Sequence, residues 1–271
     1  MSTLVGTLIV LGGLGLFFGL LLSFAGAKLK TKTDPKLESL KDILPGVNCG
    51  GCGRAGCGAF AEDVFAGKAE SDGCPVGGAE LNHKIADIMG VDASESTRMT
   101  AYVKCVGSNT HSLSLYKYDG VESCRAAVRL AGGGAKACTH GCLGAASCKA
   151  ACMFDAIRII DGVAIVDNEK CTGCKMCIKF CPKPGLIEMV PYGSSIRVGC
   201  NAPDGGKVVR TNCNIGCIGC RLCLKRCGHD AIHMEGQLAQ ILYDKCKNCG
   251  ACAEACPKKC IIHVSSAMNG N

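Results

Sequence analysis

Five cysteines stand within the segment CNIGCIGCRLCLKRC at residues 213–227, in a chain that has 25 cysteines among 271 residues. Thiols two to five residues apart do not pair readily with each other in disulfides, but they can surround one metal centre. The odd number of cysteines also argues against a full set of intramolecular bridges. The spacing therefore indicates thiolate-bound metal, and it leaves open which of the five are ligands.

Two further runs have the spacing C-x2-C-x2-C-x3-C-P, namely CTGCKMCIKFCP at 171–182 and CKNCGACAEACP at 246–257. In such a run three cysteines lie on a loop around one [4Fe–4S] cube. The fourth begins a short helix and ligates a second cube. Zinc ribbons use separate C-x-x-C pairs instead of interlocked triplets, so these runs predict iron–sulfur clusters.

The chain also matches itself when it is shifted by 75 residues, which places eight cysteines on eight. Cys138, Cys142, Cys148 and Cys152 fall on Cys213, Cys217, Cys223 and Cys227, and Cys171, Cys174, Cys177 and Cys181 fall on Cys246, Cys249, Cys252 and Cys256. The segment DAI at 155–157 falls on DAI at 230–232. The repeat predicts two copies of one module, residues 136–192 and 193–265.

The interlocked spacing assigns four cysteines to each of four clusters in these modules. The expected sets are Cys138, Cys142, Cys148 and Cys181; Cys152, Cys171, Cys174 and Cys177; Cys217, Cys220, Cys223 and Cys256; and Cys227, Cys246, Cys249 and Cys252. In the first copy Ala145 stands at the position of Cys220, so Cys138 is expected to be a ligand there. By the repeat, its equivalent Cys213 would then be the ligand in the second copy, in place of Cys220. Loop geometry favours Cys220, and we follow the geometry, which leaves Cys213 spare.

A separate group, Cys49, Cys52, Cys57 and Cys74, precedes the modules. Cys49 and Cys52 can hold one centre from a glycine-rich turn. The segment AFAEDVFAGKAE at 59–70 has helical apolar spacing and would return the chain to Cys74. Four cysteines also suit zinc, which the spacing of this group alone does not exclude. We expect a fifth [4Fe–4S] cluster here, in a small domain over residues 41–90.

Four other cysteines, Cys105, Cys124, Cys200 and Cys260, have no expected cluster and are interpreted as small buried apolar side chains. A sixth cluster made from these and Cys213 is not supported by spacing. YVKC and IRVGC resemble strand ends, and AIRIIDGVAIVD at 156–167 predicts a hairpin that turns at Asp161 and Gly162.

The N-terminal residues 1–27 carry no charged side chain and are long enough to cross a bilayer. No basic residue precedes this segment, whereas Lys28, Lys30, Lys32 and Lys36 follow it, which favours an uncleaved anchor over a signal peptide. The positive-inside rule then places the cysteine domains in the cytoplasm. Residues 28–40 are expected to be a linker, 91–135 a connecting region of open fold, and 266–271 a tail.

Composition adds two limits. The aromatic content is 4%, with no Trp, so the apolar core is weak and bound clusters are expected to hold the fold together. The formal net charge is +7, but it ignores the thiolates, and no stripe of basic and aromatic residues predicts nucleic-acid binding. No catalytic arrangement and no pattern for a nicotinamide or flavin site is recognisable.

An anchor, the Cys49–Cys74 group and ferredoxin-like modules, in this order, resemble the B subunit of the Rnf complex, the ion-translocating ferredoxin:NAD+ oxidoreductase. The first group also resembles corrinoid iron–sulfur proteins, but residues after 90 leave no room for a cobalamin domain. The expected fold class is α+β, with an N-terminal transmembrane helix, a small [4Fe–4S] domain and two tandem bacterial-type 2[4Fe–4S] ferredoxin-like modules. The resemblance implies about five [4Fe–4S] clusters.

The resemblance also implies a function. In that family the B subunit is held at the cytoplasmic face of the cell membrane and takes electrons from soluble reduced ferredoxin, while other membrane and flavin-binding subunits reduce NAD+ and translocate Na+ or H+. The chain departs from the motif at Met153 and Gly228, which replace proline after Cys152 and Cys227. Two alternatives remain: an electron-transfer subunit of another membrane enzyme, such as a hydrogenase or a molybdenum reductase, and a non-redox protein that uses metal to fold.

Overall fold

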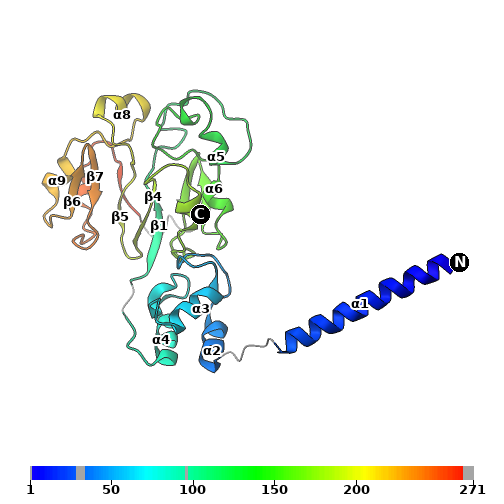
Figure 1. Cartoon of the computed structure of the whole chain (residues 1–271). Helices are drawn as coiled ribbons and strands as arrows, with labels where there is room; N and C mark the ends of the chain where they lie inside the picture. The colour runs from blue at the N-terminus through cyan, green and yellow to red at the C-terminus, as the bar shows by residue number, and fades with distance from the viewer. Residues whose placement is uncertain (1, 29–33, 95–96, 265–271) are drawn as a thin grey trace.

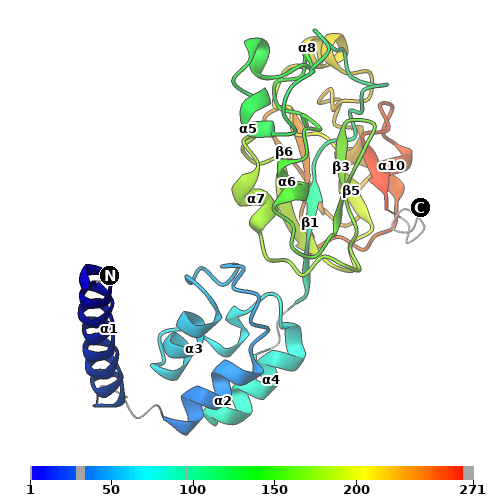
Figure 2. The same ribbon diagram turned by 90° about the vertical axis from the view of Figure 1, so that its right-hand side faces the viewer.

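The computed structural model describes residues 2–28, 34–94 and 97–264 (Figure 1). The expected flank residues Lys30 and Lys32 and the tail 266–271 lie outside these ranges. The first helix, α1 (Ser2–Lys28), stands apart from the rest of the chain in both views (Figures 1 and 2). Its apolar stretch Val5–Gly26 is long enough to cross a membrane and has no buried residue, so α1 fits a membrane anchor.

The small domain that follows is helical. It consists of α2 (Pro35–Ile43), α3 (Cys57–Phe65), the short 3-10 helix η1 (Ser71–Gly73) and α4 (Gly78–Met89). The domain therefore includes residues 35–40, which were expected to belong to a linker, because Leu40 packs in its core. Asp34 caps α2 by accepting a hydrogen bond from the Lys36 amide at 2.8 Å. Leu40, Phe60 and Ile85 form its buried core. The helix predicted within residues 59–70 is confirmed for residues 59–65, because α3 ends at Phe65.

Each of the two repeated modules contains a hairpin and two short helices. The first has β2 (Ile157–Ile160), β3 (Val163–Val166), α6 (Ser147–Ala150) and α7 (Met176–Phe180), and the second has β6 (Ile232–Glu235), β7 (Leu238–Ile241), α9 (Leu222–Arg226) and α10 (Ala251–Glu254). The predicted turn at Asp161 and Gly162 is confirmed, because Ile160 pairs with Val163. Both turn residues have positive φ, 45° and 73°, as a tight hairpin requires.

Two more strand pairs join distant parts of the chain. β1 (Met99–Val103) runs antiparallel to β4 (Ile187–Pro191), and β5 (Ile196–Val198) runs antiparallel to β8 (Ile261–His263). The strand ends expected at YVKC and IRVGC are thus confirmed as β1 and β5. Part of the expected connecting region 91–135 therefore pairs with the first module. The region also contains α5 (Cys124–Ala127) and the 3-10 turn η2 (Ala131–Gly133), and α8 (Gly206–Asn212) lies in the second module.

A buried arginine joins the two modules. Arg197 on β5 is 1% exposed, and its Nε and Nη2 donate to the Ser194 carbonyl at 3.2 and 2.9 Å. Its guanidinium lies 5.0 Å from the ring centroid of Tyr102 on β1. Desolvation lowers the pKa of Arg197, and the nearby Glu188 carboxylate partly offsets this effect. The contact holds the first module's β1–β4 sheet against the second module.

Candidate metal centres

The small domain brings its four expected cysteines together. Cys49, Cys52, Cys57 and Cys74 line one cavity beside Phe60. Gly50 and Gly53 turn the loop with φ of 70° and 79°, conformations that other residues rarely adopt. The Gly51 amide donates to the Cys49 sulfur at 3.5 Å. Burial raises the pKa of the Cys74 thiol, and the backbone of Gly77 and Val76 partly offsets this rise.

The C-x2-C-x2-C-x3-C-P run of the first module places its first three cysteines on one cavity. Cys171, Cys174 and Cys177 line it together with Cys152, which is the expected set. The Ala101 amide on β1 donates to the Cys171 sulfur at 3.4 Å. A Cβ on Gly51 of the small domain would lie 2.9 Å from the Cys174 carbonyl oxygen. The cysteine loop of the small domain therefore packs directly on this site.

The other cluster site of the first module differs from the expected grouping. Cys148 interacts electrostatically with Cys142, Cys124 and Cys181, whereas Cys138 lies elsewhere. Cys124 begins α5, where its amide donates to the Ser147 hydroxyl at 2.8 Å, and its side chain packs against Ala145. Cys124 thus approaches from outside the repeat to the position that Cys220 occupies in the second module.

Loop geometry explains why Cys124 can take the place that Cys220 has in the second module. Gly144 and Ala146 have φ of 72° and 60°, and the corresponding Gly219 and Arg221 have φ of 67° and 59°. The two loops therefore follow the same path. Between its two left-handed residues, the first loop has Ala145 and the second has Cys220. Only the second loop can therefore bind metal at this position.

The second module forms two cavities. Cys217, Cys220, Cys223 and Cys256 line one, and Cys227, Cys246, Cys249 and Cys252 line the other, as the expected sets require. Cys220 and Cys249 are exposed, so both sites reach the surface. Cys260 also lines the first cavity, with its sulfur 3.6 Å from that of Cys256.

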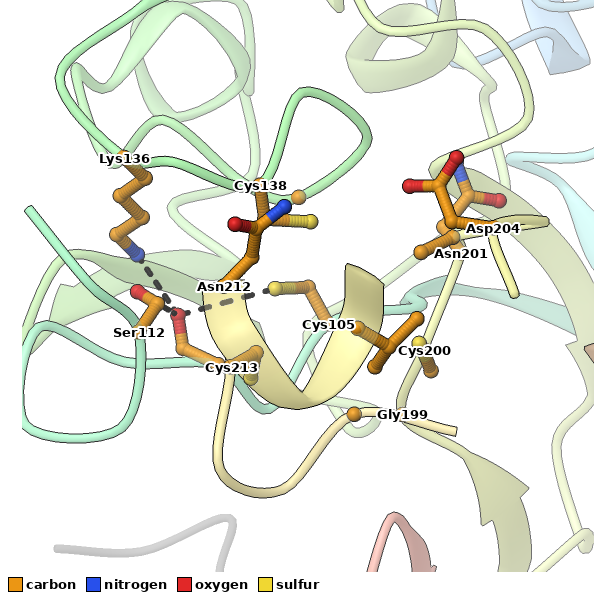
Figure 3. Close-up of a pocket in the computed structure, with 15 residues that line it drawn as sticks. Cys105, Ser112, Lys136, Cys138, Gly199, Cys200, Asn201, Asp204, Asn212 and Cys213 are labelled. Carbon is orange, nitrogen blue, oxygen red and sulfur yellow. Dashed lines mark hydrogen bonds between the residues drawn. The ribbon is translucent and has the colours of Figure 1, made fainter. Parts of the chain in front are cut away.

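A further cavity lies between the modules and has a volume of about 30 Å³ (Figure 3). It is lined by Cys105, Cys138, Cys200 and Cys213, which come from four separate segments. The spacing along the chain could not reveal this group, because its successive members are 13 to 62 residues apart. The one usable signal was the repeat itself, since Cys138 and Cys213 are equivalent positions and both line the cavity.

The donor sets fit clusters better than single ions. Among the described residues, no group of three His, Cys, Asp or Glu side chains converges closely enough to hold one metal ion. A cube separates its four thiolates because each binds a different iron. Burial also raises the pKa of the Cys148 and Cys177 thiols to about 12. Metal must therefore displace their protons on binding.

Three family models match the chain. A model for an Fe-S cluster matches residues 44–76, a 4Fe-4S binding domain matches 164–184, and a 4Fe-4S dicluster domain matches 209–257. Cys105, Cys138 and Cys200 lie outside all three ranges.

Curated relatives match nearly the whole chain. The B subunit of the Na+-translocating ferredoxin:NAD+ oxidoreductase complex of Acetobacterium woodii is 44% identical over 93% of this chain and 75% of its own length. The B subunit of the ion-translocating oxidoreductase complex of Methanosarcina acetivorans is 40% identical over 96% and 98%. The B subunit of the proton-translocating ferredoxin:NAD+ oxidoreductase complex of Clostridium ljungdahlii is 37% identical over 99% and 95%.

Proposed function

Because the chain belongs to the B-subunit family of ion-translocating ferredoxin:NAD+ oxidoreductase (Rnf) complexes, we propose that it takes electrons from soluble reduced ferredoxin and passes them to partner subunits. The chain is an electron-transfer subunit of an oxidoreductase complex and carries 4Fe-4S domains. The partners, membrane and flavin-binding subunits, then reduce NAD+ and translocate Na+ or H+. The names of the relatives include both ions, so the coupling ion stays open.

The observation that carries this proposal is the series of four-cysteine sites. We assign the four expected cysteines of the small domain to one cluster. Three more clusters take the sets Cys152, Cys171, Cys174 and Cys177; Cys217, Cys220, Cys223 and Cys256; and Cys227, Cys246, Cys249 and Cys252. The remaining set is Cys142, Cys148 and Cys181, with Cys124 as its fourth thiolate because it packs against Ala145. A bound [4Fe–4S] cluster accepts and donates one electron. The thiolates stay attached throughout, so no bond forms or breaks.

Protein surroundings favour electron transfer over chemistry on a substrate. The cavities that hold four of the expected sets are small, about 10 to 20 Å³, and their linings are dominated by cysteine, glycine and apolar residues. Exposed Cys220 and Cys249 provide edges where electrons can enter or leave. NAD+ reduction requires two electrons and one proton, and we assign that step to the partner subunits, where a flavin can collect single electrons.

The anchor places these sites at the membrane. We propose that α1 spans the bilayer once and that the cysteine domains face the cytoplasm, because Lys28, Lys30, Lys32 and Lys36 follow the apolar segment. Protease treatment of sealed, right-side-out vesicles tests this orientation. The cysteine domains should be protected there and digested in inverted vesicles, and the reverse pattern would refute it.

The direct test is reduction of the anaerobically purified full chain by reduced ferredoxin. The broad visible absorption of the clusters should bleach, and the sample should contain iron and sulfide in equal amounts. A sample with zinc in place of iron, or iron–sulfur absorption that ferredoxin does not bleach, would refute the proposed function.

A further inference from the structure

Four cysteines without a shared sequence motif meet between the two modules. Cys105, Cys200 and Cys213 are buried and Cys138 is half-buried around the cavity of about 30 Å³ (Figure 3). Cys105 belongs to the apolar core of the first module and Cys200 to that of the second. Cys138 comes from the first module but packs against the core of the second. The group therefore lies at the junction of both cores.

Glycines leave space around these sulfurs. A Cβ built on Gly107 would lie 3.2 Å from the Cys213 sulfur and 3.7 Å from that of Cys105. One built on Gly141 would lie 3.4 Å from the Cys138 sulfur and 3.5 Å from the Cys105 sulfur. Sulfurs of three different segments therefore approach the same small volume, and glycine keeps the volume open.

Backbone hydrogen bonds hold the contributing segments in place. The Val106 amide, next to Cys105, donates to the Gly199 carbonyl at 3.0 Å, next to Cys200. The Leu113 amide donates to the Asn212 carbonyl at 2.9 Å, and Cys213 forms a bridge with Ser112. These contacts fix three of the four cysteines independently of any bound group, as a preformed site requires.

A buried cation supplies an independent indication. Lys136 is 5% exposed, and its Nζ donates to the carbonyls of Gly107 and Gly162, both at 2.8 Å. In Figure 3 its dashed line meets that of Cys105 at one oxygen, the Gly107 carbonyl. The exposed Asp161 carboxylate interacts with Lys136 electrostatically, but no carboxylate of the described residues forms an ion pair with it. A buried ammonium is costly unless negative charge lies near it, and metal-bound thiolates supply that charge.

We propose that Cys105, Cys138, Cys200 and Cys213 bind a sixth [4Fe–4S] cluster that connects the two ferredoxin-like modules. This inference rests on the proposed electron-transfer function and deepens it. The backbone of Cys142 contacts the Cys105 sulfur, and the backbone of Cys217 contacts the Cys200 sulfur. One neighbouring set contains Cys142 and the other contains Cys217. The sixth cluster thus lies between the cluster of the Cys142 set and the cluster of the Cys217 set. It accepts one electron from one of these clusters and passes it to the other.

Native mass spectrometry of the anaerobic full chain in detergent tests the number of clusters without any substitution. We expect a mass corresponding to six clusters and about 24 irons per chain. A stable maximum of five clusters, with about 20 irons, would refute the sixth site and leave the proposed function intact. If six clusters were present but ferredoxin did not bleach them, the proposed function would be refuted and the sixth site would stand.

Single and double substitutions locate the ligands. Cys213→Ala and Cys220→Ala should each remove about four irons, and the double variant about eight, because the two cysteines serve different clusters. If they were alternative ligands of one cluster, the double variant would lose no more than the more damaging single variant, and the proposal would fail. Cys200→Ala should behave like Cys213→Ala.

Cys260→Ala is the matched control, since Cys260 is 2% exposed and lies beside two expected ligands but outside the six sets. It should retain about 24 irons. An alanine variant that keeps a three-iron cluster would show a new EPR signal in the oxidised state, which equally identifies the ligand. If Cys213→Ala does not fold, the wild-type cluster number still decides. Alkylation of both Cys105 and Cys200 in a fully loaded chain would refute the site.

Discussion

At the scale of single residues, Cys260 adjoins a predicted cluster without belonging to its ligand set. Hydrogen bonds with Cys260 lower the pKa of the Cys256 and Cys217 thiols to about 5 and about 6, and they raise the pKa of Cys260 itself. When Cys256 binds a cluster as a thiolate, Cys260 can donate its single S–H to the Cys256 sulfur, which lies 3.6 Å away. Such a donor stabilises the reduced cluster, which carries the greater negative charge.

Replacing Cys260 with alanine should consequently lower one reduction potential without removing a cluster. A hydrogen bond contributes roughly 0.5–1.5 kcal/mol, which for one electron corresponds to roughly 20–60 mV. An EPR-monitored redox titration of wild type and Cys260→Ala would measure the shift. An unchanged set of potentials would contradict the donor role, and a loss of about four irons would make Cys260 a ligand.

Ala145 offers a test of the role proposed for Cys124. Cys124→Ala should lose one cluster, because the set of Cys142, Cys148 and Cys181 then lacks a fourth thiolate. Adding Ala145→Cys should restore it, since this loop follows the same backbone path as the loop that carries Cys220. Iron per chain should fall by about four and then return.

The matched control is Cys138→Ala combined with Ala145→Cys. Cys138 belongs to the other cavity, so the new cysteine should not restore the lost iron. Restoration in this variant, or none in the Cys124 variant, would contradict the assignment.

At the scale of elements, each cysteine loop depends on its contact with a hairpin turn. Gly144 has φ of 72°, and a Cβ there would lie 2.6 Å from the Gly162 carbonyl oxygen at the β2–β3 turn. Backbone strain and overpacking each cost roughly 1–3 kcal/mol. Gly144→Ala should therefore destabilise the first module and reduce occupancy of the cluster that this loop holds.

Thermal unfolding followed by cluster absorption would measure this effect. Gly193→Ala is the control, because Gly193 is exposed and a Cβ there meets nothing within 4 Å. Equal unfolding temperatures for both variants would contradict the proposed contact.

The elements also show how far the sequence could lead. The hairpin turn at Asp161 and Gly162, the helix within residues 59–70 and the expected placing of the Cys171 and Cys246 runs depend on local spacing, so they were predictable. The approach of Cys124 to Ala145 and the meeting of Cys105 with Cys200 depend on contacts between distant segments. A local pattern contains no record of such contacts. Only the equivalence of Cys138 and Cys213 in the repeat indicated a shared site between the modules. Cys213 had no predicted role, because loop geometry favoured Cys220 as the ligand.

At the scale of the whole molecule, Arg197 on β5 holds the two ferredoxin-like modules together through its contact with Tyr102 on β1. Truncating it to alanine would remove its cation–π contact with Tyr102, roughly 0.5–2 kcal/mol, and leave a cavity that adds to the loss. We expect a total destabilisation of roughly 2–4 kcal/mol. The junction site should lose iron before the sites inside each module, because its cysteines come from both cores.

Stepwise iron loss during chemical denaturation would reveal this order. Arg210→Ala, on the exposed face of α8, is the control and should behave like wild type. Iron loss in Arg197→Ala that is uniform across all sites would contradict the link between Arg197 and the junction.

A continuous series of clusters that carries electrons is best tested by an anaerobic titration of the full chain with reduced ferredoxin. Electrons accepted and irons bound would be counted in the same sample. We predict about one electron for every four irons, and about six electrons per chain in total. Iron–sulfur clusters that accept no electrons from ferredoxin, or a chain that contains zinc in their place, would contradict electron transfer through this chain.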